Sequence, residues 1–106
     1  MSRYRVLLHG RNVLLDLDGE RHVGGFYIHC CVEASHDAAA AATAIALLRR
    51  HPRYLALLEG TDGSPPQPEP TRLVDELEQL PWWERRPPGV TERFVFHVDP
   101  DEVPVQ

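Results

Sequence analysis

The fold is decided by residues 24–48, which read GGFYIHCCVEASHDAAAAATAIALL. The first part, from Phe26 to Val32, is rich in aromatic and β-branched residues that suit a pleated, half-buried surface, so it predicts a strand. Short polar side chains up to Asp37 can then accept the free N–H groups of a first helical turn. The alanine-rich run to Leu48 predicts a helix that lies back on the strand.

Two shorter patterns precede this unit. Residues 4–8 and residues 12–18 each alternate between apolar and polar positions with a period of two, which is typical of strands. Asp18-Gly19 is a turn dipeptide because glycine adopts positive φ at low cost, and it predicts a hairpin into the strand of residues 23–33. The three strands would form an N-terminal β-meander.

The expected core lies between this sheet and the helix, which is predicted from about Asp37 to His51, before Pro52. Strand alternation predicts one core-facing set in the third strand: Phe26, Ile28, Cys30 and Val32. Helical periodicity predicts the sheet-facing side of the helix: Ala38, Ala41, Ala42, Ile45 and Leu48.

The C-terminal half is less regular. Residues 53–58 fit either a further helical turn or a short strand, and the prolines and turn formers of residues 60–70 predict an exposed loop. Residues 71–80 have helical spacing but could equally join the sheet, and both alternatives stay open. Residues 93–98 predict a final strand with three inward side chains: Phe94, Phe96 and Val98.

Composition points to one soluble domain spanning residues 1–106. The chain has no apolar run near the roughly 20 residues that cross a bilayer, and no secretory signal, so we expect no membrane and a cytoplasmic location. Adjacent Cys30 and Cys31 point to opposite faces of a strand and should be free thiols. The net charge of −5 gives no basic footprint and argues against nucleic acid.

The most chemically specific residues share the sheet face opposite the helix. Alternation places Tyr27, His29 and Cys31 there, with His97 on the final strand and His9 at the end of the first. Imidazole and thiolate suit zinc or a similar metal, and Cys31 could act as a nucleophile beside a histidine. The paired spacings of a metal site and an oxyanion hole are missing, so we predict no metal, no cofactor and no catalytic residue, and favour half-exposed or oligomer-covered side chains.

Apolar residues on the same face are candidate interface positions, because a solvated sheet face should be polar. They are Leu7, Leu14, Tyr27 and Val95. The proline-flanked pair Trp82-Trp83 could cover one end of the sheet as a lid, which we favour, or be an exposed anchor for a partner.

Several short motifs together resemble a family of small, uncharacterised bacterial proteins. They are Tyr4-Arg5-Val6-Leu7, Gly25-Phe26-Tyr27, Val32-Glu33-Ala34-Ser35, Val74-Asp75-Glu76-Leu77 and Phe94-Val95-Phe96. The resemblance implies that the Val-Asp-Glu-Leu segment and the closing aromatic run are strands. It implies no biochemical activity.

The sequence therefore predicts an α+β fold, in which an antiparallel sheet with an N-terminal β-meander has one main helix on one face, as a variant of ferredoxin-like folds. The main functional hypothesis is a non-enzymatic interaction module that self-associates through its sheet as a homo-oligomer. The alternative is a small-molecule or metal-binding protein, possibly an enzyme, that uses His9, His29, Cys31 and His97.

Overall fold

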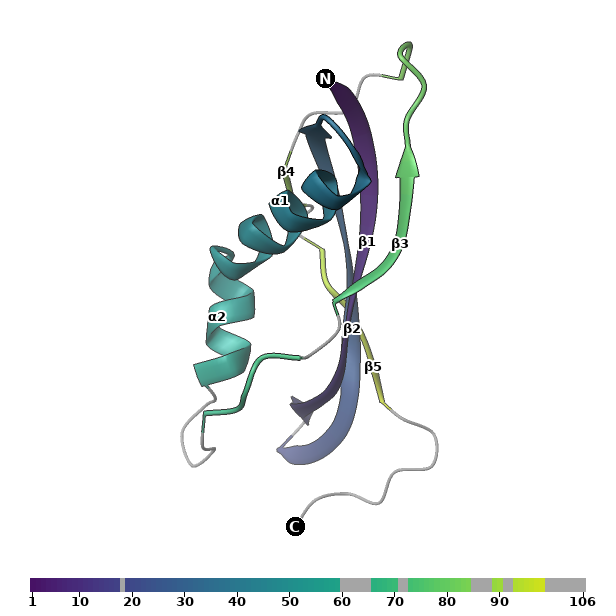
Figure 1. Cartoon of the computed structure of the whole chain (residues 1–106). Coiled ribbons are helices and arrows are strands. Elements are labelled where there is room, and N and C mark those ends of the chain that lie inside the picture. Colours follow the sequence, from purple (N-terminus) through teal and green to yellow (C-terminus); the bar gives the residue numbers. More distant parts are fainter. Residues whose placement is uncertain (18, 60–65, 71–72, 85–88, 91–92, 99–106) are drawn as a thin grey trace.

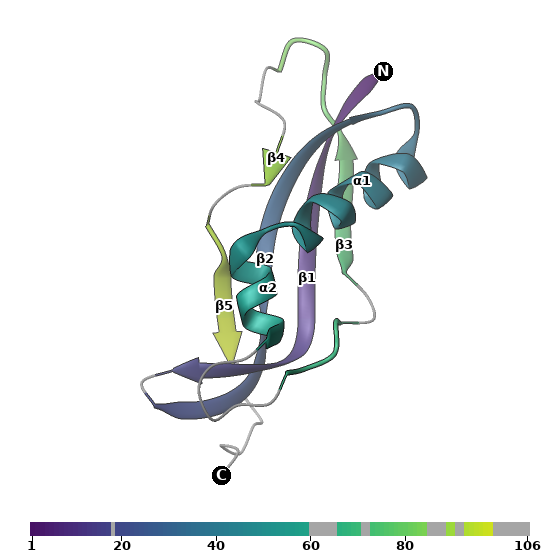
Figure 2. The same ribbon diagram turned by 90° about the vertical axis from the view of Figure 1, so that its left-hand side faces the viewer.

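The computed structural model describes residues 1–17, 19–59, 66–70, 73–84, 89–90 and 93–98 of the 106-residue chain. Within these residues an antiparallel sheet carries two helices on one face, as Figures 1 and 2 show from two directions. The elements follow in the order β1 (Ser2–Leu17), β2 (Glu20–Ala34), α1 (Asp37–Arg49), α2 (Pro52–Glu59), β3 (Val74–Gln79), β4 (Gly89–Val90) and β5 (Val95–Val98). The predicted α+β class is confirmed, with two helices where the sequence predicted one main helix.

One long hairpin of β1 and β2 replaces the predicted three-strand meander. β1 pairs with β2 over its whole length, and the register shifts once, between Arg11 and Val13. Asn12 lies at this shift with φ 57°, so the extra residue forms a β-bulge. The bulge moves the core-facing positions from even numbers, ending at Gly10, to odd numbers, starting at Val13. The change in apolar alternation near Asn12, which predicted a boundary between two strands, is therefore a bulge within the single strand β1.

The strand order is β3-β1-β2-β4, and β5 also pairs with β2. β4 pairs opposite Cys30 and Cys31, whereas β5 pairs opposite residues 24–27, so β4 and β5 share one edge of the sheet. β3 forms the other edge of the sheet, so residues 74–79 form a strand and not a helix. The succession of two strands, two helices and three strands differs from the βαββαβ order of ferredoxin-like folds, so that part of the prediction is not confirmed.

Both helices begin with a histidine cap. The Nδ1 atom of His36 accepts a hydrogen bond from the Ala39 N–H at 3.2 Å, and Nδ1 of His51 accepts from the Arg53 N–H at 3.2 Å. α1 ends at Arg49, slightly before the predicted end near His51, and Pro52 opens α2, because proline is tolerated at the first position of a helix. No helix within the described residues is long and apolar enough to span a membrane.

The core lies between the helices and the even-numbered side chains of β2. Phe26, Ile28, Cys30 and Val32 are buried as predicted. The buried face of α1 matches the prediction at Leu48 but otherwise differs: its other buried residues are Ala40 and Ala44, whereas Ala38 and Ala42 are exposed. In a nearly uniform alanine run, periodicity does not define which side faces the sheet, and the tertiary packing decides it.

The end of the chain also differs from its prediction. Phe94 is buried, but Phe96 and Val98 are 38% and 39% exposed. β5 pairs only with β2 in the described sheet, so these two side chains lie at an edge that α2 covers incompletely. The Arg53 guanidinium lies over the Phe96 ring, 5.8 Å from its centre.

Residues 66–70 are attached to the sheet and helices by side chains. The amide of Gln67 accepts from the Leu14 N–H at 2.9 Å and donates to the Leu14 carbonyl at 3.2 Å, so it replaces a strand partner there. The same amide donates to the carbonyl of Leu57 near the end of α2. This part of the predicted loop of residues 60–70 is thereby fixed, and residues 60–65 lie outside the described residues.

Candidate functional site

Both helices lie on one face of the sheet (Figure 1). The opposite face, here called the open face, carries side chains from four strands. On β1 they alternate with the buried residues Tyr4, Val6 and Leu8. In the rows from Arg3 to Arg11, the open-face side chains are Arg3, Arg5, Leu7, His9 and Arg11 of β1; Tyr27, His29, Cys31 and Glu33 of β2; Glu76 and Glu78 of β3; and Val95 and His97 of β5.

Three of the predicted site residues meet on this face. His9 lies opposite Tyr27 in the β1–β2 register, and the two rings stack with centres 4.0 Å apart. His97 lies opposite Gly25, and its Nε2 is 2.8 Å from Nε2 of His9. His9 is therefore only 6% exposed although it lies on a face without helices.

Gly25 makes the approach of His97 possible. A Cβ atom at residue 25 would lie 2.7 Å from His97 Nε2 and would also overlap the carbonyl oxygen of Gly10. Any side chain here would push the imidazole away from His9. Close backbone approach therefore accounts for the glycine at this position of the strand.

Arg11 determines the proton positions of the two rings. Its Nε–H donates to Nδ1 of His9 at 3.1 Å, so Nδ1 carries a lone pair and the proton of neutral His9 is on Nε2. His9 Nε2–H then donates to Nε2 of His97, whose own proton must be on Nδ1. We call His9 and His97 in this arrangement the histidine pair.

The other two predicted residues stay outside this cluster. His29 lies opposite Leu7, and Cys31 lies opposite Arg5, so each occupies a different row of the sheet from the histidine pair. Within the described residues no three His, Cys, Asp or Glu side chains gather closely enough to hold a metal ion. The four-residue ligand set of the alternative hypothesis is therefore not assembled.

The two cysteines are free thiols on opposite faces, as predicted. Burial, together with the neighbouring Cys31, raises the pKa of the Cys30 thiol to about 11. A thiol reacts as its thiolate, so Cys30 is chemically inert near neutral pH. Cys31 is half-buried on the open face.

The apolar interface candidates have unequal exposure. Val95 is 57% exposed, whereas Leu7, Leu14 and Tyr27 are half-buried. Leu14 lies beyond the β-bulge, between buried Val13 and Leu15, and so points away from the core.

The tryptophans do not form the predicted lid. Trp82 and Trp83 are 89% and 67% exposed, and their rings contact each other edge to face with centres 5.9 Å apart. They follow β3, where the chain leaves the sheet edge.

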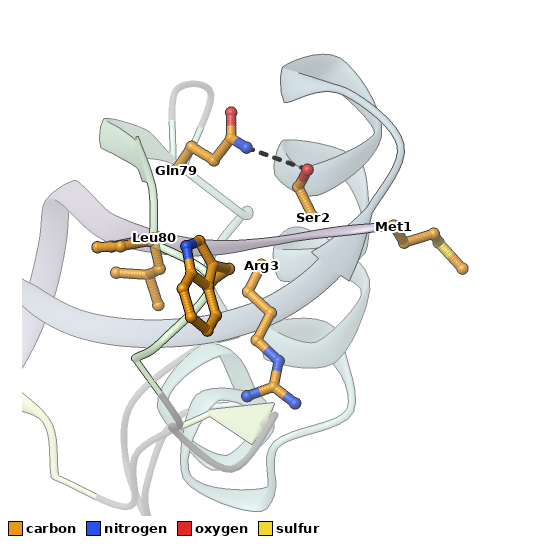
Figure 3. A pocket seen from close by; sticks show the side chains of 7 residues that line it. Met1, Ser2, Arg3, Gln79 and Leu80 are labelled. Atoms are coloured by element: carbon orange, nitrogen blue, oxygen red, sulfur yellow. Dashed lines mark hydrogen bonds between the residues drawn. The ribbon is translucent and has the colours of Figure 1, made fainter.

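A hollow of about 910 Å³ lies beside Trp82, at the start of β1 and the end of β3. Figure 3 shows how Arg3 and Leu80 line it, with the Gln79 amide donating to the Ser2 hydroxyl at 3.0 Å. Arg3 is also paired with Glu33 at 3.3 Å. Three polar side chains of the lining are therefore engaged, Gln79 with Ser2 and Arg3 with Glu33.

Sequence reasoning missed Arg11, the residue that orients His9. The only available signal was its place two residues after His9 on the same strand face, which brings neighbouring side chains together. The 88-residue separation of His9 and His97 gave no local pattern at all.

Comparison of the chain with family models, curated proteins and solved structures found no significant match. The resemblance to a family of small bacterial proteins stays a prediction, and the function has to be argued from the open face itself.

Proposed function

We propose that this protein is a non-enzymatic interaction module that self-associates through the open face of its sheet. The observation that carries the proposal is the exposure of Val95, 57%, beside Tyr27 in the register of a face that neither helix covers. Half-buried Leu7 and Cys31 extend the apolar surface along the central strands. A solvated antiparallel sheet normally has polar side chains at such positions.

Charge favours a second copy of the chain as the partner. In the rows from Arg3 to Arg11, the described residues of the open face include three arginines and three glutamates, so this part of the face is neutral although the whole chain has a net charge of −5. Arg5 of β1 and Glu78 of β3 form an ion pair at 3.0 Å. Two such faces do not repel each other, and alternating charges can pair across a two-fold axis. A polyanion such as nucleic acid gains no attraction from a neutral face.

No observation supports the ligand-binding alternative in the way that the exposure of Val95 supports self-association. A histidine that binds a metal or abstracts a proton needs an available nitrogen lone pair. In His9 one ring nitrogen accepts from Arg11 and the other donates to His97, so this ring is already engaged.

Sedimentation equilibrium at micromolar concentration tests the proposal, with Val95→Arg as the interface variant. A charge within a desolvated contact should weaken dimerisation at least about tenfold. Leu55→Arg is the matched control, because Leu55 is a 43% exposed apolar residue on α2, away from the open face. It should leave the dissociation constant unchanged.

Wild-type protein that stays monomeric at the highest concentration would contradict the proposal. Equal weakening by Val95→Arg and Leu55→Arg would also contradict it, because association would then follow net charge and not this face. Circular dichroism of each variant establishes that the sheet is intact.

A further inference from the structure

We propose that the outer edge of β3 binds an extended peptide in which basic and apolar residues alternate. β3 forms one edge of the sheet, and among the described residues no strand pairs with its outer side (Figure 1). A peptide that adds a strand to such an edge gains main-chain hydrogen bonds without a rearrangement of the fold. The site lies at the edge opposite to β4 and β5 and does not require self-association.

The main-chain groups of Leu77 and Gln79 point away from β1. The Leu80 N–H donates to the Arg3 carbonyl at 2.8 Å, which fixes the alternation along the strand. Hydrogen-bonded pairs recur every second residue of an antiparallel ladder, so the even-numbered residues of β3 from residue 76 onwards face β1 in the same way. The N–H and C=O groups of the two odd-numbered residues therefore form the outer side, with which a further strand can pair.

A hollow of about 340 Å³ lies beside this edge on the open face. Its lining includes Glu76 and Glu78 of β3 and Arg5 and Leu7 of β1. Arg5 pairs with Glu78 at 3.0 Å, whereas exposed Glu76 lies opposite half-buried Leu7 in the β1–β3 register. The hollow thus combines a carboxylate with an aliphatic surface. An arginine or lysine side chain suits both, because its stem is apolar and its head is charged.

The opposite face of the edge favours apolar side chains. Leu77 lies opposite buried Val6, and it is only partly buried where it packs against the core. An added strand would place every second side chain beside Leu77 and could cover its exposed part. Since successive side chains of a strand point to opposite faces, the peptide that satisfies both faces alternates between basic and apolar residues.

Charge favours such a peptide over a second copy of β3. The strand has three exposed acidic side chains and no basic residue. Two copies side by side would set like charges against each other, whereas a basic strand is attracted. The inner side of β3 already pairs with a strand of the proposed pattern, because in β1 Arg3 and Arg5 alternate with buried Tyr4 and Val6.

The test is fluorescence anisotropy of a labelled synthetic peptide of alternating arginine and valine, with the length of β3, titrated with the full chain. This peptide should bind at least about tenfold more tightly than its counterpart of alternating glutamate and valine. N-methylation of its amides keeps the charges but removes the main-chain donors, and it should weaken binding at least about tenfold. Spermine, a polycation without a peptide main chain, should not displace the peptide at equal concentration.

Charge variants identify the carboxylate that is involved. Glu76→Gln should weaken binding of the arginine–valine peptide about threefold to fivefold, as expected for one partly solvated ion pair. Glu59→Gln is the matched control, because it removes the same charge from an exposed residue at the end of α2 and should leave the affinity unchanged. Glu76→Lys should shift the preference towards the glutamate–valine peptide.

Amide hydrogen exchange followed by NMR locates the peptide on the sheet. In the free protein the Leu77 and Gln79 amides should exchange faster than that of Glu78. With the peptide at about ten times its dissociation constant, protection of the two outer amides should rise about tenfold, and protection of residues 95–98 should stay constant.

Four results would overturn the proposal. They are an arginine–valine peptide that does not bind, equal binding of the N-methylated peptide or displacement by spermine, equal weakening by Glu76→Gln and Glu59→Gln, and bound peptide that leaves the exchange of the Leu77 and Gln79 amides unchanged.

Discussion

Replacement of Gly25 by alanine tests whether close backbone approach, and not chain flexibility, requires glycine at this position. The added Cβ would overlap the carbonyl oxygen of Gly10 and lie 2.7 Å from His97 Nε2, whereas ordinary van der Waals contact begins near 3.4 Å. The His97 ring can rotate away, but the Gly10 carbonyl is part of the paired β1–β2 backbone and cannot move alone.

The expected loss of stability in Gly25→Ala follows from the clash with the fixed Gly10 carbonyl. Overpacking in a well-packed region costs typically about 1–3 kcal/mol, and we expect about 2 kcal/mol for Gly25→Ala. For a domain of this size that loss lowers the melting temperature by about 10 °C. Urea unfolding followed by circular dichroism measures the free energy directly, and an unchanged m-value shows that the denatured state is comparable.

Gly19→Ala is the matched control. Its Cβ would meet nothing within 4 Å, but Gly19 has φ +84°, so alanine costs about 1 kcal/mol through backbone strain alone. The double variant Gly25→Ala/His97→Ala identifies the resisting neighbour. If removal of the His97 ring restores the free energy lost in Gly25→Ala, or if Gly25→Ala costs less than Gly19→Ala, the assignment of the clash to the Gly10 carbonyl is refuted.

Three further predictions concern other parts of the fold. The hydrogen bond from Arg49 holds the pKa of Glu69 below its ordinary value of 4.5, against a smaller opposing effect of burial. The ionised carboxylate therefore stabilises the fold above pH 4.5, and this stabilisation is lost as the pH falls through the lowered pKa. In acid titrations below about pH 5, the unfolding free energy of the wild type should fall more steeply than that of Glu69→Gln. At about pH 8 a thiol reagent should modify Cys31 first and Cys30 only at the rate of unfolding, and mass spectrometry showing equal modification would contradict the burial of Cys30. At the β-bulge, Asn12→Val should cost about 1–2 kcal/mol because a β-branched residue does not tolerate positive φ, whereas Asn12→Gly should change stability by less than about 0.5 kcal/mol in the same urea assay.

The elements with strong local patterns could be predicted from the sequence. The alternation of Phe26, Ile28, Cys30 and Val32 gives a strand with one buried face, because successive side chains point to opposite sides of a sheet. The same alternation placed His9, Tyr27 and His97 on one face without any knowledge of their distances. Turn residues at Asp18-Gly19 predicted the hairpin that joins β1 to β2.

Other features depend on residues that are distant in the sequence, and only the tertiary structure decided them. The apolar alternation changes phase near Asn12, which is compatible with either the end of a strand or a bulge within one strand. The two are distinguished by whether β2 continues to pair with β1 beyond Asn12. The exposure of Trp82 and Trp83 depends on which surfaces surround the turn after β3. The contact of His9 with His97 joins residues 88 positions apart, and it forms because β5 returns to β2 where Gly25 leaves room for an imidazole ring.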